Sequence, residues 1–291
     1  MPVNLEEALK KATAVLECAA VSTPLLDAQV LLCHVLQVDR LYLYAHSDRL
    51  LVQGEERRYF ELIEKRAEGM PVQYLVQNQE FMGLDFHVEE GILIPRADTE
   101  VLVENVIQYF QERKRISSPL IADLGTGSGA IAVSLASWIS HAFVYAVDIS
   151  EKAIEISKGN AQRHGVSERM RFLRGDLFQP LKAKALEGKL DALVSNPPYI
   201  PRREIDNLQK EVAVYEPRLA LDGGEDGLDF YRRIIEDAPL FLKEGGLLAF
   251  EVGYDQAQPV NQMLNEKGCF QDIEIKKDLS GIERVVTALR A

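Results

Sequence analysis

Four consecutive residues, Asn196-Pro197-Pro198-Tyr199, carry the strongest chemical signal in the sequence. The two prolines fix the backbone and remove two N–H donors, so the nearby carbonyl groups are free to accept hydrogen bonds. The Asn196 side chain adds a carbonyl acceptor, and two acceptors can hold both hydrogens of an NH₂ group. Such a grip aims a weakly nucleophilic amide nitrogen at an electrophile and stabilises the positive charge that develops on it. Tyr199 is placed to stack over a planar target.

A glycine-rich run, DLGTGSG at residues 123–129, predicts a second binding element. Glycines at alternate positions let the backbone approach a ligand closely, and the helix that follows offers free N–H groups at its N-terminus. The segment 125–130 also fits the dinucleotide fingerprint G-x-G-x-x-A, so by itself it does not separate the two ligand classes. No Gly-Lys-Ser/Thr follows, which excludes a P-loop.

Acidic residues decide between these ligands. Asp148 lies about 20 residues past the glycine run, where a carboxylate accepts hydrogen bonds from both ribose hydroxyls. Asp123 would repel a pyrophosphate but suits the cationic amino group of a methionine moiety, which favours S-adenosylmethionine. Asp176 is expected to meet the adenine amine, although a turn or helix-cap role is about as compatible with its position. Leu177 and Phe178 then offer apolar contact to the adenine ring.

These residues need a scaffold, and the hydrophobic periodicity predicts one. Residues 4–68 are helical throughout and form a small bundle, and the aromatic residues around Gly83 favour a short hairpin. From Leu120 onward, short apolar runs alternate with helices, which predicts a parallel sheet with helices on both faces. The last two runs, joined by a turn at 279–281, should form an antiparallel hairpin at one edge. Seven such strands are typical of class I methyltransferases, an α/β Rossmann-like fold.

Composition limits the partners. The 291 residues carry a net charge of −12, which argues against a protein whose main task is to grip bare duplex DNA. No apolar run is long enough to cross a membrane, and no leader sequence is visible, so we expect a cytoplasmic protein. Three scattered cysteines argue against a disulfide framework or a zinc site, and we expect free, mostly buried thiols and no metal.

At this point the sequence resembles the release-factor glutamine methyltransferases, the HemK/PrmC family. The likeness covers residues 70–291, and the helical N-terminal part is similar with weaker motifs. The matching stretches are F-x-G-x-x-F-x-V at 81–88, LIPRADTE at 93–100, DLGTGSG at 123–129, SNPPYI at 195–200, YEPRLAL at 215–221 and DGG at 222–224 with Gly227-Leu228.

The resemblance implies that the methyl group of S-adenosylmethionine moves to the glutamine side-chain nitrogen of the Gly-Gly-Gln motif in class I peptide chain release factors, which act in translation termination. S-adenosylhomocysteine is then the other product. Asn196 and the Pro197 carbonyl would hold the glutamine amide in the catalytic turn 196–199, with Phe81, Arg96 and Tyr199 near the substrate. The residues expected at the cofactor are Asp123, Gly125, Thr126, Gly127, Gly129, Asp148, Ile149, Asp176, Leu177 and Asn196.

The pattern along the chain suggests a division into a helical domain at 1–70, a hairpin linker at 71–95 and a methyltransferase domain at 96–291. Because the helical domain brings no chemistry of its own, we expect it to recognise the substrate. We expect a monomer. Two alternatives share the Asn-Pro-Pro-Tyr chemistry. One is a glutamine methyltransferase acting on a ribosomal protein. The other is a DNA adenine-N6 methyltransferase, which the acidic balance and the lack of a basic target-recognition domain disfavour.

Overall fold

The computed structural model describes residues 3–113 and 116–291, and the chain divides into two compact units. The first contains the chain up to Asn78 together with residues 209–215, and the second contains residues 79–208 and 216–291. Each unit has a hydrophobic core of its own. The structure therefore divides the chain at Asn78, where the sequence analysis has boundaries at 70 and 95, and assigns the hairpin to the second unit.

The first unit is helical, as predicted. Its core is built from the apolar faces of the longer helices, and helix starts are set by local caps: the Asn4 side chain accepts a hydrogen bond from the Glu7 N–H at 2.8 Å. Two of its helices, at residues 72–76 and 210–215, lie outside the predicted helical region. Segments of five or six residues are too short to show a periodic pattern. The helices are α1 (Leu5–Cys18), α2 (Pro24–Leu36), α3 (Arg40–Ala45), α4 (Gln53–Ala67), α5 (Val72–Val76) and α10 (Lys210–Tyr215).

A buried arginine ties α10 to this bundle. Arg66 is only 2% exposed, and its guanidinium donates to the Asp27 carboxylate and to the Glu211 carboxylate, both at 2.6 Å. It also donates to the Met70 carbonyl at 3.2 Å. Because Glu211 lies 145 residues after Arg66 in the chain, this ion pair explains why a short segment from far along the sequence belongs to the helical unit.

The second unit is built on a seven-stranded sheet with the order β5-β4-β3-β6-β7-β9-β8, preceded by the separate hairpin β1-β2. The strands from β3 to β7 pair in parallel, and β9 pairs antiparallel with both β7 and β8. The predicted sheet with an antiparallel edge hairpin is confirmed. The strands are β1 (Gln79–Phe81), β2 (Leu84–Phe86), β3 (Leu120–Leu124), β4 (Phe143–Asp148), β5 (Met170–Arg174), β6 (Leu190–Ser195), β7 (Leu242–Glu251), β8 (Phe270–Lys277) and β9 (Glu283–Arg290).

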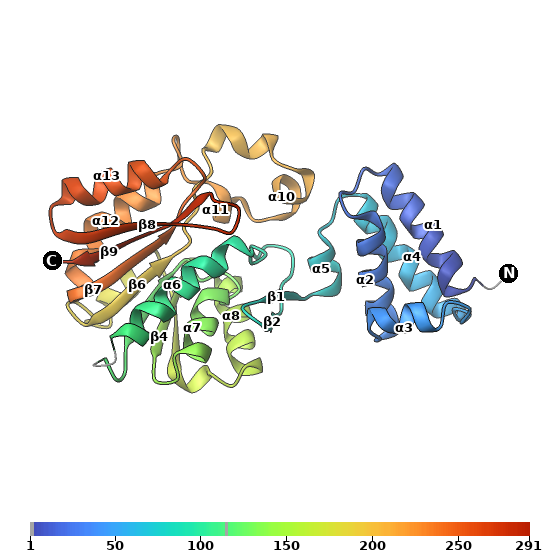
Figure 1. The fold of residues 1–291 in the computed structure, drawn as a ribbon, viewed down its shortest axis with the longest axis horizontal. Helices are drawn as coiled ribbons and strands as arrows, with labels where there is room; N and C mark the ends of the chain where they lie inside the picture. Colours follow the sequence, from blue (N-terminus) through green and yellow to red (C-terminus); the bar gives the residue numbers. More distant parts are fainter. Residues whose placement is uncertain (1–2, 114–115) are drawn as a thin grey trace. The chain divides into compact units, whose positions relative to one another are not determined.

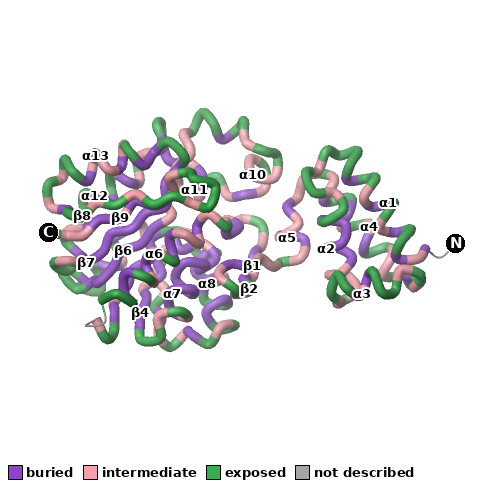
Figure 2. Tube along the Cα trace, in the orientation of Figure 1, coloured by how far each residue is buried: buried purple, intermediate pink, exposed green. Residues whose placement is uncertain are grey.

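Helices cover both faces of this sheet (Figure 1). The central strands are buried along their length (Figure 2), and alternate residues face opposite cores, as Ala192 and Leu193 do in β6. One face packs on α6 (Asp98–Glu112), α7 (Ala130–Trp138) and α8 (Glu151–Arg163), and the other on α9 (Gln179–Lys182), α12 (Asp229–Phe241) and α13 (Ala257–Lys267). The remaining short helices are η1 (Ser167–Arg169), η2 (Arg202–Asn207) and α11 (Arg218–Leu221).

The pairing of β3 with β6 sets the position of the site. Leu124 lies opposite Ser195 at the carboxyl ends of the two strands, and the Ser195 hydroxyl donates to the Leu124 carbonyl at 2.7 Å. The glycine run after β3 and the Asn-Pro-Pro-Tyr turn after β6 therefore start from the same edge of the sheet. In open α/β sheets ligands bind at this edge, where the strand order reverses.

Two smaller expectations have mixed outcomes. The three cysteines carry free thiols, but Cys18 is exposed and Cys33 and Cys269 are only partly buried, so the expectation of mostly buried thiols is wrong. Cys18 lies on the last turn of α1, where the side chain points away from the core. Within residues 3–113 and 116–291, no helix is long and apolar enough to cross a membrane.

The Arg66 network generates a prediction for stability. Replacing Arg66 with Met leaves the buried Asp27 carboxylate unpaired, which should lower the free energy of unfolding by about 3–5 kcal/mol. The matched control is Arg57→Met in the same helix, because the Arg57–Glu61 pair is exposed and should contribute less than about 1 kcal/mol. Urea unfolding of the full chain measures both, and similar losses in the two variants would contradict this account of Arg66.

Candidate active site

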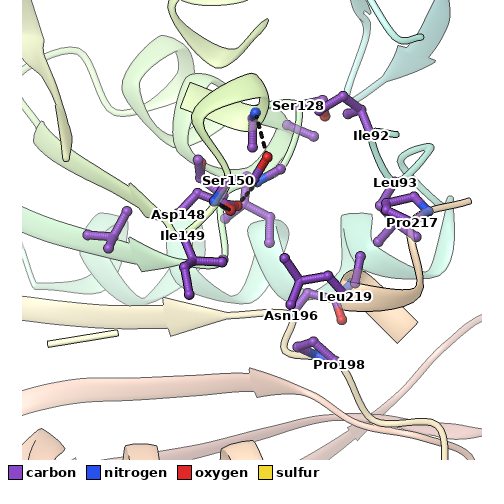
Figure 3. Close-up of a pocket in the computed structure, with 18 of the residues that line it drawn as sticks. Ile92, Leu93, Ser128, Asp148, Ile149, Ser150, Asn196, Pro198, Pro217 and Leu219 are labelled. Carbon is purple, nitrogen blue, oxygen red and sulfur yellow. Dashed lines mark hydrogen bonds between the residues drawn. The ribbon is translucent and has the colours of Figure 1, made fainter. Parts of the chain in front are cut away.

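A pocket opens at the carboxyl edge of the sheet, within the second unit (Figure 3). It brings together ten of the residues that the sequence analysis assigns to the site. They are Arg96, Gly125, Thr126, Gly127, Asp148, Ile149, Asp176, Leu177, Asn196 and Pro198. Asp123, Gly129, Pro197, Tyr199 and Phe81 lie outside this lining. Figure 3 shows Asp148 and Ile149 on one side of the pocket, with Asn196, Pro198 and Leu219 on another.

The glycine run turns its backbone toward the pocket. Gly125 and Gly127 have φ values of +79° and +55°, a left-handed conformation that favours glycine, and a Cβ at either position would meet open space. The N–H groups of Gly125 and Thr126 both donate to the Val147 carbonyl at 2.9 Å, which ties the run to the end of β4. A flat ligand can therefore lie directly against the backbone here.

Gly129, the third glycine of the run, allows two helices to pack closely. Gly129 has a φ of +83°, and a Cβ there would approach the Ser157 Cβ to 2.9 Å. Its missing side chain thus allows α7 to begin close against α8. This explains why Gly129 lies behind the pocket, although the sequence analysis groups it with the other two glycines.

Asp148 holds the two neighbouring loops in place. Its Oδ2 accepts the Gly127 N–H at 2.9 Å, and its Oδ1 accepts the Ser150 N–H at 2.8 Å. Burial raises the pKa of this carboxyl, and the backbone hydrogen bonds partly offset that effect. An ionised carboxylate has about four acceptor positions, so the two oxygens retain capacity for ligand hydroxyls on the pocket side.

Asp123 lies beneath the glycine run and is fully buried. Its Oδ2 accepts the Thr126 hydroxyl at 2.7 Å, whereas Oδ1 accepts no hydrogen bond from the part of the chain that the structure describes. Burial, together with the charge of Asp148, raises the pKa of Asp123 to about 7, against the effect of the Thr126 hydrogen bond. Asp123 thus supports the loop from below rather than from the pocket wall.

The segment that follows β5 contributes two residues to the pocket lining. Asp176 lines the pocket, and its carboxylate pairs with Arg233 at 2.5 Å. Leu177 also lines the pocket and has a φ of +44°. Phe178, by contrast, is buried and stacks on Phe241 with ring centroids 4.8 Å apart. The expectation that Phe178 offers contact to an adenine ring is therefore wrong, because its ring fills the core instead.

The Asn-Pro-Pro-Tyr turn leaves β6 with its asparagine at the pocket. The Asn196 Nδ2 donates to the Thr99 hydroxyl oxygen at 3.2 Å, while no donor from residues 3–113 or 116–291 reaches its Oδ1. Pro198 lines the pocket and Pro197 is buried. The side-chain carbonyl of Asn196 is thus available as an acceptor.

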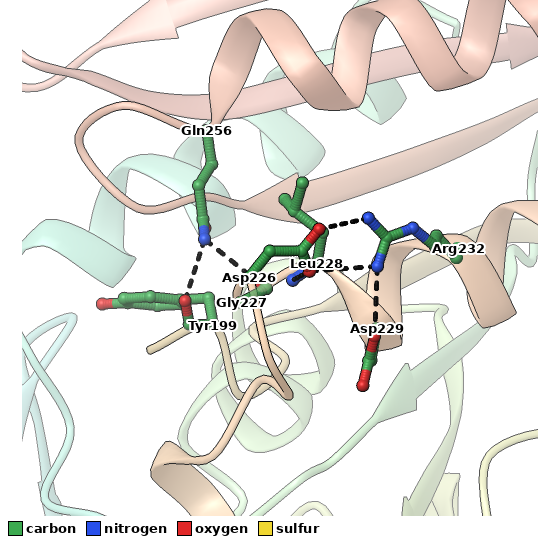
Figure 4. A network of polar contacts seen from close by, with 7 residues as sticks. All are labelled: Tyr199, Asp226, Gly227, Leu228, Asp229, Arg232 and Gln256. Atoms are coloured by element: carbon green, nitrogen blue, oxygen red, sulfur yellow. Dashed lines mark hydrogen bonds and ion pairs between the residues drawn. The ribbon is translucent and has the colours of Figure 1, made fainter. Parts of the chain in front are cut away.

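A network behind the turn fixes its backbone (Figure 4). The Gln256 Nε2 donates to the Tyr199 carbonyl at 2.8 Å and to the Gly227 carbonyl at 3.2 Å. Gly227 has a φ of +78°, and a Cβ there would lie 2.4 Å from the Tyr199 carbonyl oxygen. The loop that carries Gly227 is held in turn by Arg232, which donates to Asp226. The close approach at Gly227 therefore leaves the turn no room to shift backward.

A buried acid lies beside the same turn. Glu251, the last residue of β7, is 1% exposed, and the Tyr199 hydroxyl lies 3.5 Å from its Oε1. Its pKa is raised to about 7, because burial and the charge of Asp98 outweigh the lowering effect of Thr99, Arg284 and Asn196. Burial and the charge of Glu251 also raise the pKa of the Tyr199 phenol.

Two predicted substrate residues differ in their surroundings. Arg96 lines the pocket, and its guanidinium donates to the buried Glu216 carboxylate at 2.5 Å. Phe81 is only 1% exposed and packs edge-on against Phe86 in the core, with ring centroids 6.1 Å apart. Phe81 therefore supports the hairpin and does not reach the pocket.

Several residues of the site were not predicted from the sequence. Thr99, Leu219 and Phe230 line the pocket, and Glu251 lies behind Asn196. Glu251 carries a signal that could have been used, since it is an acid at the carboxyl end of a buried apolar strand. Thr99 stands in the 93–100 run, but nothing in its local pattern distinguishes it from a helix-start residue.

The sequence is similar to known methyltransferases. The sequence matches the PrmC N-terminal domain family over residues 7–76 and the Methyltransferase small domain family over residues 97–221. A release factor glutamine methyltransferase from Clostridium acetobutylicum is 42% identical over 290 residues, covering 99% of each chain. Another, from Moorella thermoacetica, is 43% identical over 288 residues, again 99% of each chain.

Solved structures support the fold alone. The hMettl16 catalytic domain in complex with MAT2A 3'UTR hairpin 6 has a TM-score of 0.55 and 16% identity, covering 84% of each chain. A delta-N METTL16 MTase domain has a TM-score of 0.52 and 19% identity, covering 72% of this chain and 90% of its own.

The sheet order and the two loops that meet at its edge define a class I methyltransferase. More particularly, the chain belongs to the release factor glutamine methyltransferase family, because relatives of that name match it over nearly its whole length. The resemblance found from the sequence motifs is confirmed, and the chain is an enzyme that transfers methyl groups. Family membership also implies S-adenosylmethionine as the methyl donor.

The raised pKa of Glu251 predicts how stability depends on pH. A carboxyl with a folded-state pKa of about 7 and an ordinary value of 4.5 binds its proton more tightly in the folded chain, so its effect on stability becomes unfavourable as the pH rises from 4.5 to 7. Glu251→Gln cannot lose a proton. It should therefore exceed the wild type in free energy of unfolding by about 1–3 kcal/mol at pH 8, with little difference at pH 5.

Urea unfolding at both pH values measures this difference, with Glu244→Gln as the matched control. Glu244 lies on the same strand but is exposed, so its replacement should change stability by less than about 0.5 kcal/mol at either pH. A Glu251→Gln variant that is less stable than the wild type at pH 8 would show that the carboxylate is stabilised by its neighbours and not penalised by burial.

Proposed function

We propose that this enzyme transfers the methyl group of S-adenosylmethionine to the side-chain amide nitrogen of the glutamine in the Gly-Gly-Gln motif of class I peptide chain release factors. The observation that carries the proposal is that the glycine run and the Asn196 side chain line the same pocket. A methyl donor against the glycines and an amide against Asn196 would then lie next to each other. The names of the relatives, and their similarity to this chain over 99% of its length, support the release factor as substrate.

The residues present fit such a cofactor. The open space above Gly125 and Gly127 suits a ligand that lies against backbone, and the remaining acceptor positions of Asp148 suit ribose hydroxyls. Leu177 and the half-exposed Ile149 offer apolar contact to an adenine ring, and Asp176 suits its amine. When bound, S-adenosylmethionine supplies a methyl group on a sulfonium, which is electrophilic enough to react with a poor nucleophile.

Asp123 would contribute through charge. Its carboxyl lies directly under the glycine run, and its Oδ1 accepts no hydrogen bond from the described residues. A cationic amino group held above the run would favour the ionised form of this acid and lower its raised pKa. This role differs from a direct contact, since Asp123 does not line the pocket.

The chain's own residues would orient the acceptor nitrogen. An amide nitrogen is a poor nucleophile because its lone pair is delocalised into the carbonyl. The Asn196 carbonyl, together with the Pro197 backbone carbonyl, would accept the two N–H bonds and aim the nitrogen at the methyl group. The same acceptors would stabilise the positive charge that develops on nitrogen during transfer. Tyr199 and Arg96 would lie near the substrate glutamine. Phe81 would act only through the packing of the hairpin.

Protein recognition would fall to the helical unit. It contains none of the pocket residues, and its sequence matches the PrmC N-terminal domain family. Leu41 and Tyr44 on α3 are 74% and 64% exposed, which provides apolar surface for a protein partner. We therefore propose that this unit binds the release factor and that the second unit carries out the chemistry.

The direct test is methyl transfer from labelled S-adenosylmethionine to a purified class I release factor. A second factor, whose Gly-Gly-Gln glutamine is replaced by alanine, serves as the control. We expect label on the native factor and none on the variant. Label on both factors would place the target at another residue, and label on neither, with the cofactor bound, would favour a ribosomal protein or DNA as the substrate.

Two substitutions separate cofactor binding from transfer. Asn196→Ala should lower kcat by about 100-fold or more, since it removes an acceptor that acts in the transition state, and should leave cofactor affinity nearly unchanged. Asp148→Ala should weaken cofactor binding by about 10- to 100-fold, the equivalent of one or two hydrogen bonds to a charged group. Calorimetric titration with S-adenosylmethionine and single-turnover kinetics measure the two effects, and an exchange of the two phenotypes would refute these roles.

A further inference from the structure

The proposed role of Asn196 requires its side chain to point one way. An asparagine amide has a carbonyl oxygen and an NH₂ group of nearly equal size, so a half-turn about its last bond exchanges an acceptor for two donors. A donor facing the substrate NH₂ group would repel it. Something behind Asn196 must therefore distinguish the two orientations.

Two buried polar side chains lie behind it. Thr99, from the first turn of α6, is 4% exposed, and its hydroxyl oxygen accepts the Asn196 Nδ2 hydrogen at 3.2 Å. The Glu251 carboxyl, from the end of β7, interacts with both Thr99 and Asn196. Its Oε2 accepts no hydrogen bond of ordinary geometry from residues 3–113 or 116–291, so it retains full capacity to accept one.

The chemistry of these groups sets the direction of the hydrogen bonds that link Glu251, Thr99 and Asn196. A threonine hydroxyl can donate or accept, so Thr99 alone would tolerate either orientation of the asparagine amide. An ionised carboxylate can only accept. A Thr99 hydroxyl that turns toward the Glu251 carboxylate can only donate to it, and its oxygen is then left to accept from Asn196. The NH₂ group of Asn196 must then face inward and its carbonyl must face the pocket.

We propose that Thr99 and Glu251 are positioning residues that hold the Asn196 side-chain carbonyl toward the substrate amide. This inference rests on the proposed function, because it concerns the same amide of the acceptor glutamine. It also gives the buried acid Glu251 a function beyond its contact with the Tyr199 hydroxyl. Neither residue touches the reacting atoms in this account.

The first test compares two replacements of Thr99. Thr99→Val keeps the shape and removes the hydroxyl, whereas Thr99→Ser keeps the hydroxyl and removes a methyl group. We expect Thr99→Val to lower kcat about tenfold, the equivalent of one hydrogen bond, with KM for the release factor and affinity for S-adenosylmethionine within about twofold of wild type. Thr99→Ser should keep kcat within about threefold of wild type.

The second test uses Glu251→Gln at pH 8, where the wild-type carboxyl is ionised. The glutamine is isosteric but brings an NH₂ group that can donate to Thr99 and reverse the chain of hydrogen bonds. We expect kcat to fall about tenfold while the thermal midpoint is equal to or above that of the wild type. A residue that acted only through folding would not lower activity while maintaining stability.

The double variant Thr99→Val/Glu251→Gln should have a kcat no more than about twofold below that of either single variant, since both substitutions act on the same orientation of Asn196.

The outcomes are distinct. Wild-type kcat in Thr99→Val, or an equal loss in Thr99→Ser, would overturn the positioning role while leaving the proposed function intact. Multiplied losses in the double variant would also overturn it, because two independent effects would then be at work. Wild-type enzyme that fails to methylate the release factor, measured first in the same assay, would instead refute the proposed function and the inference with it.

Discussion

The parallel pairing of β3 with β6 is the contact on which the rest of the site depends. Leu124 and Ser195 end the two strands side by side, and the Ser195 hydroxyl bonds the Leu124 carbonyl at that point. Parallel strands present their carboxyl ends at one edge, so the segments that follow must leave the sheet together. Without this register, the glycine run and the asparagine turn would not line a common pocket. The flanking strands β4 and β7 then contribute Asp148 and Glu251 to the same edge.

Burial of acids at this edge works against folding. Asp123 and Glu251 are both at most 1% exposed, and one oxygen of each carboxyl accepts no hydrogen bond from the described residues. A buried acid without full hydrogen bonding is unfavourable for the folded state. Groups of this kind concentrate where a protein must place charge against a ligand, and both acids here lie at the site. The large apolar cores on the two faces of the sheet offset this cost.

Most of the fold could be predicted from the sequence because its signals are local and repeated. The alternation of apolar runs and helices gives the seven strands, and the glycine run and the asparagine turn each identify themselves by composition. What could not be predicted depends on distant contacts. Phe81 packs against Phe86, and Phe178 packs against Phe241, so both rings lie in the core and not in the pocket. The sequence alone does not show whether an aromatic residue next to a motif faces the core or the pocket. Thr99 acquires its place only because α6 begins beside the end of β6.

The Arg66–Glu211 ion pair has a consequence for how this protein can be recombined. The helical unit is discontinuous in the gene, since residues 209–215 belong to it although they are encoded within the methyltransferase unit. A chimera that takes residues 1–78 from a relative with a neutral side chain in place of Arg66 would leave the resident Glu211 without its cation. The exchangeable module is therefore the pair of segments, and the helical unit can be exchanged between relatives only by moving both at once.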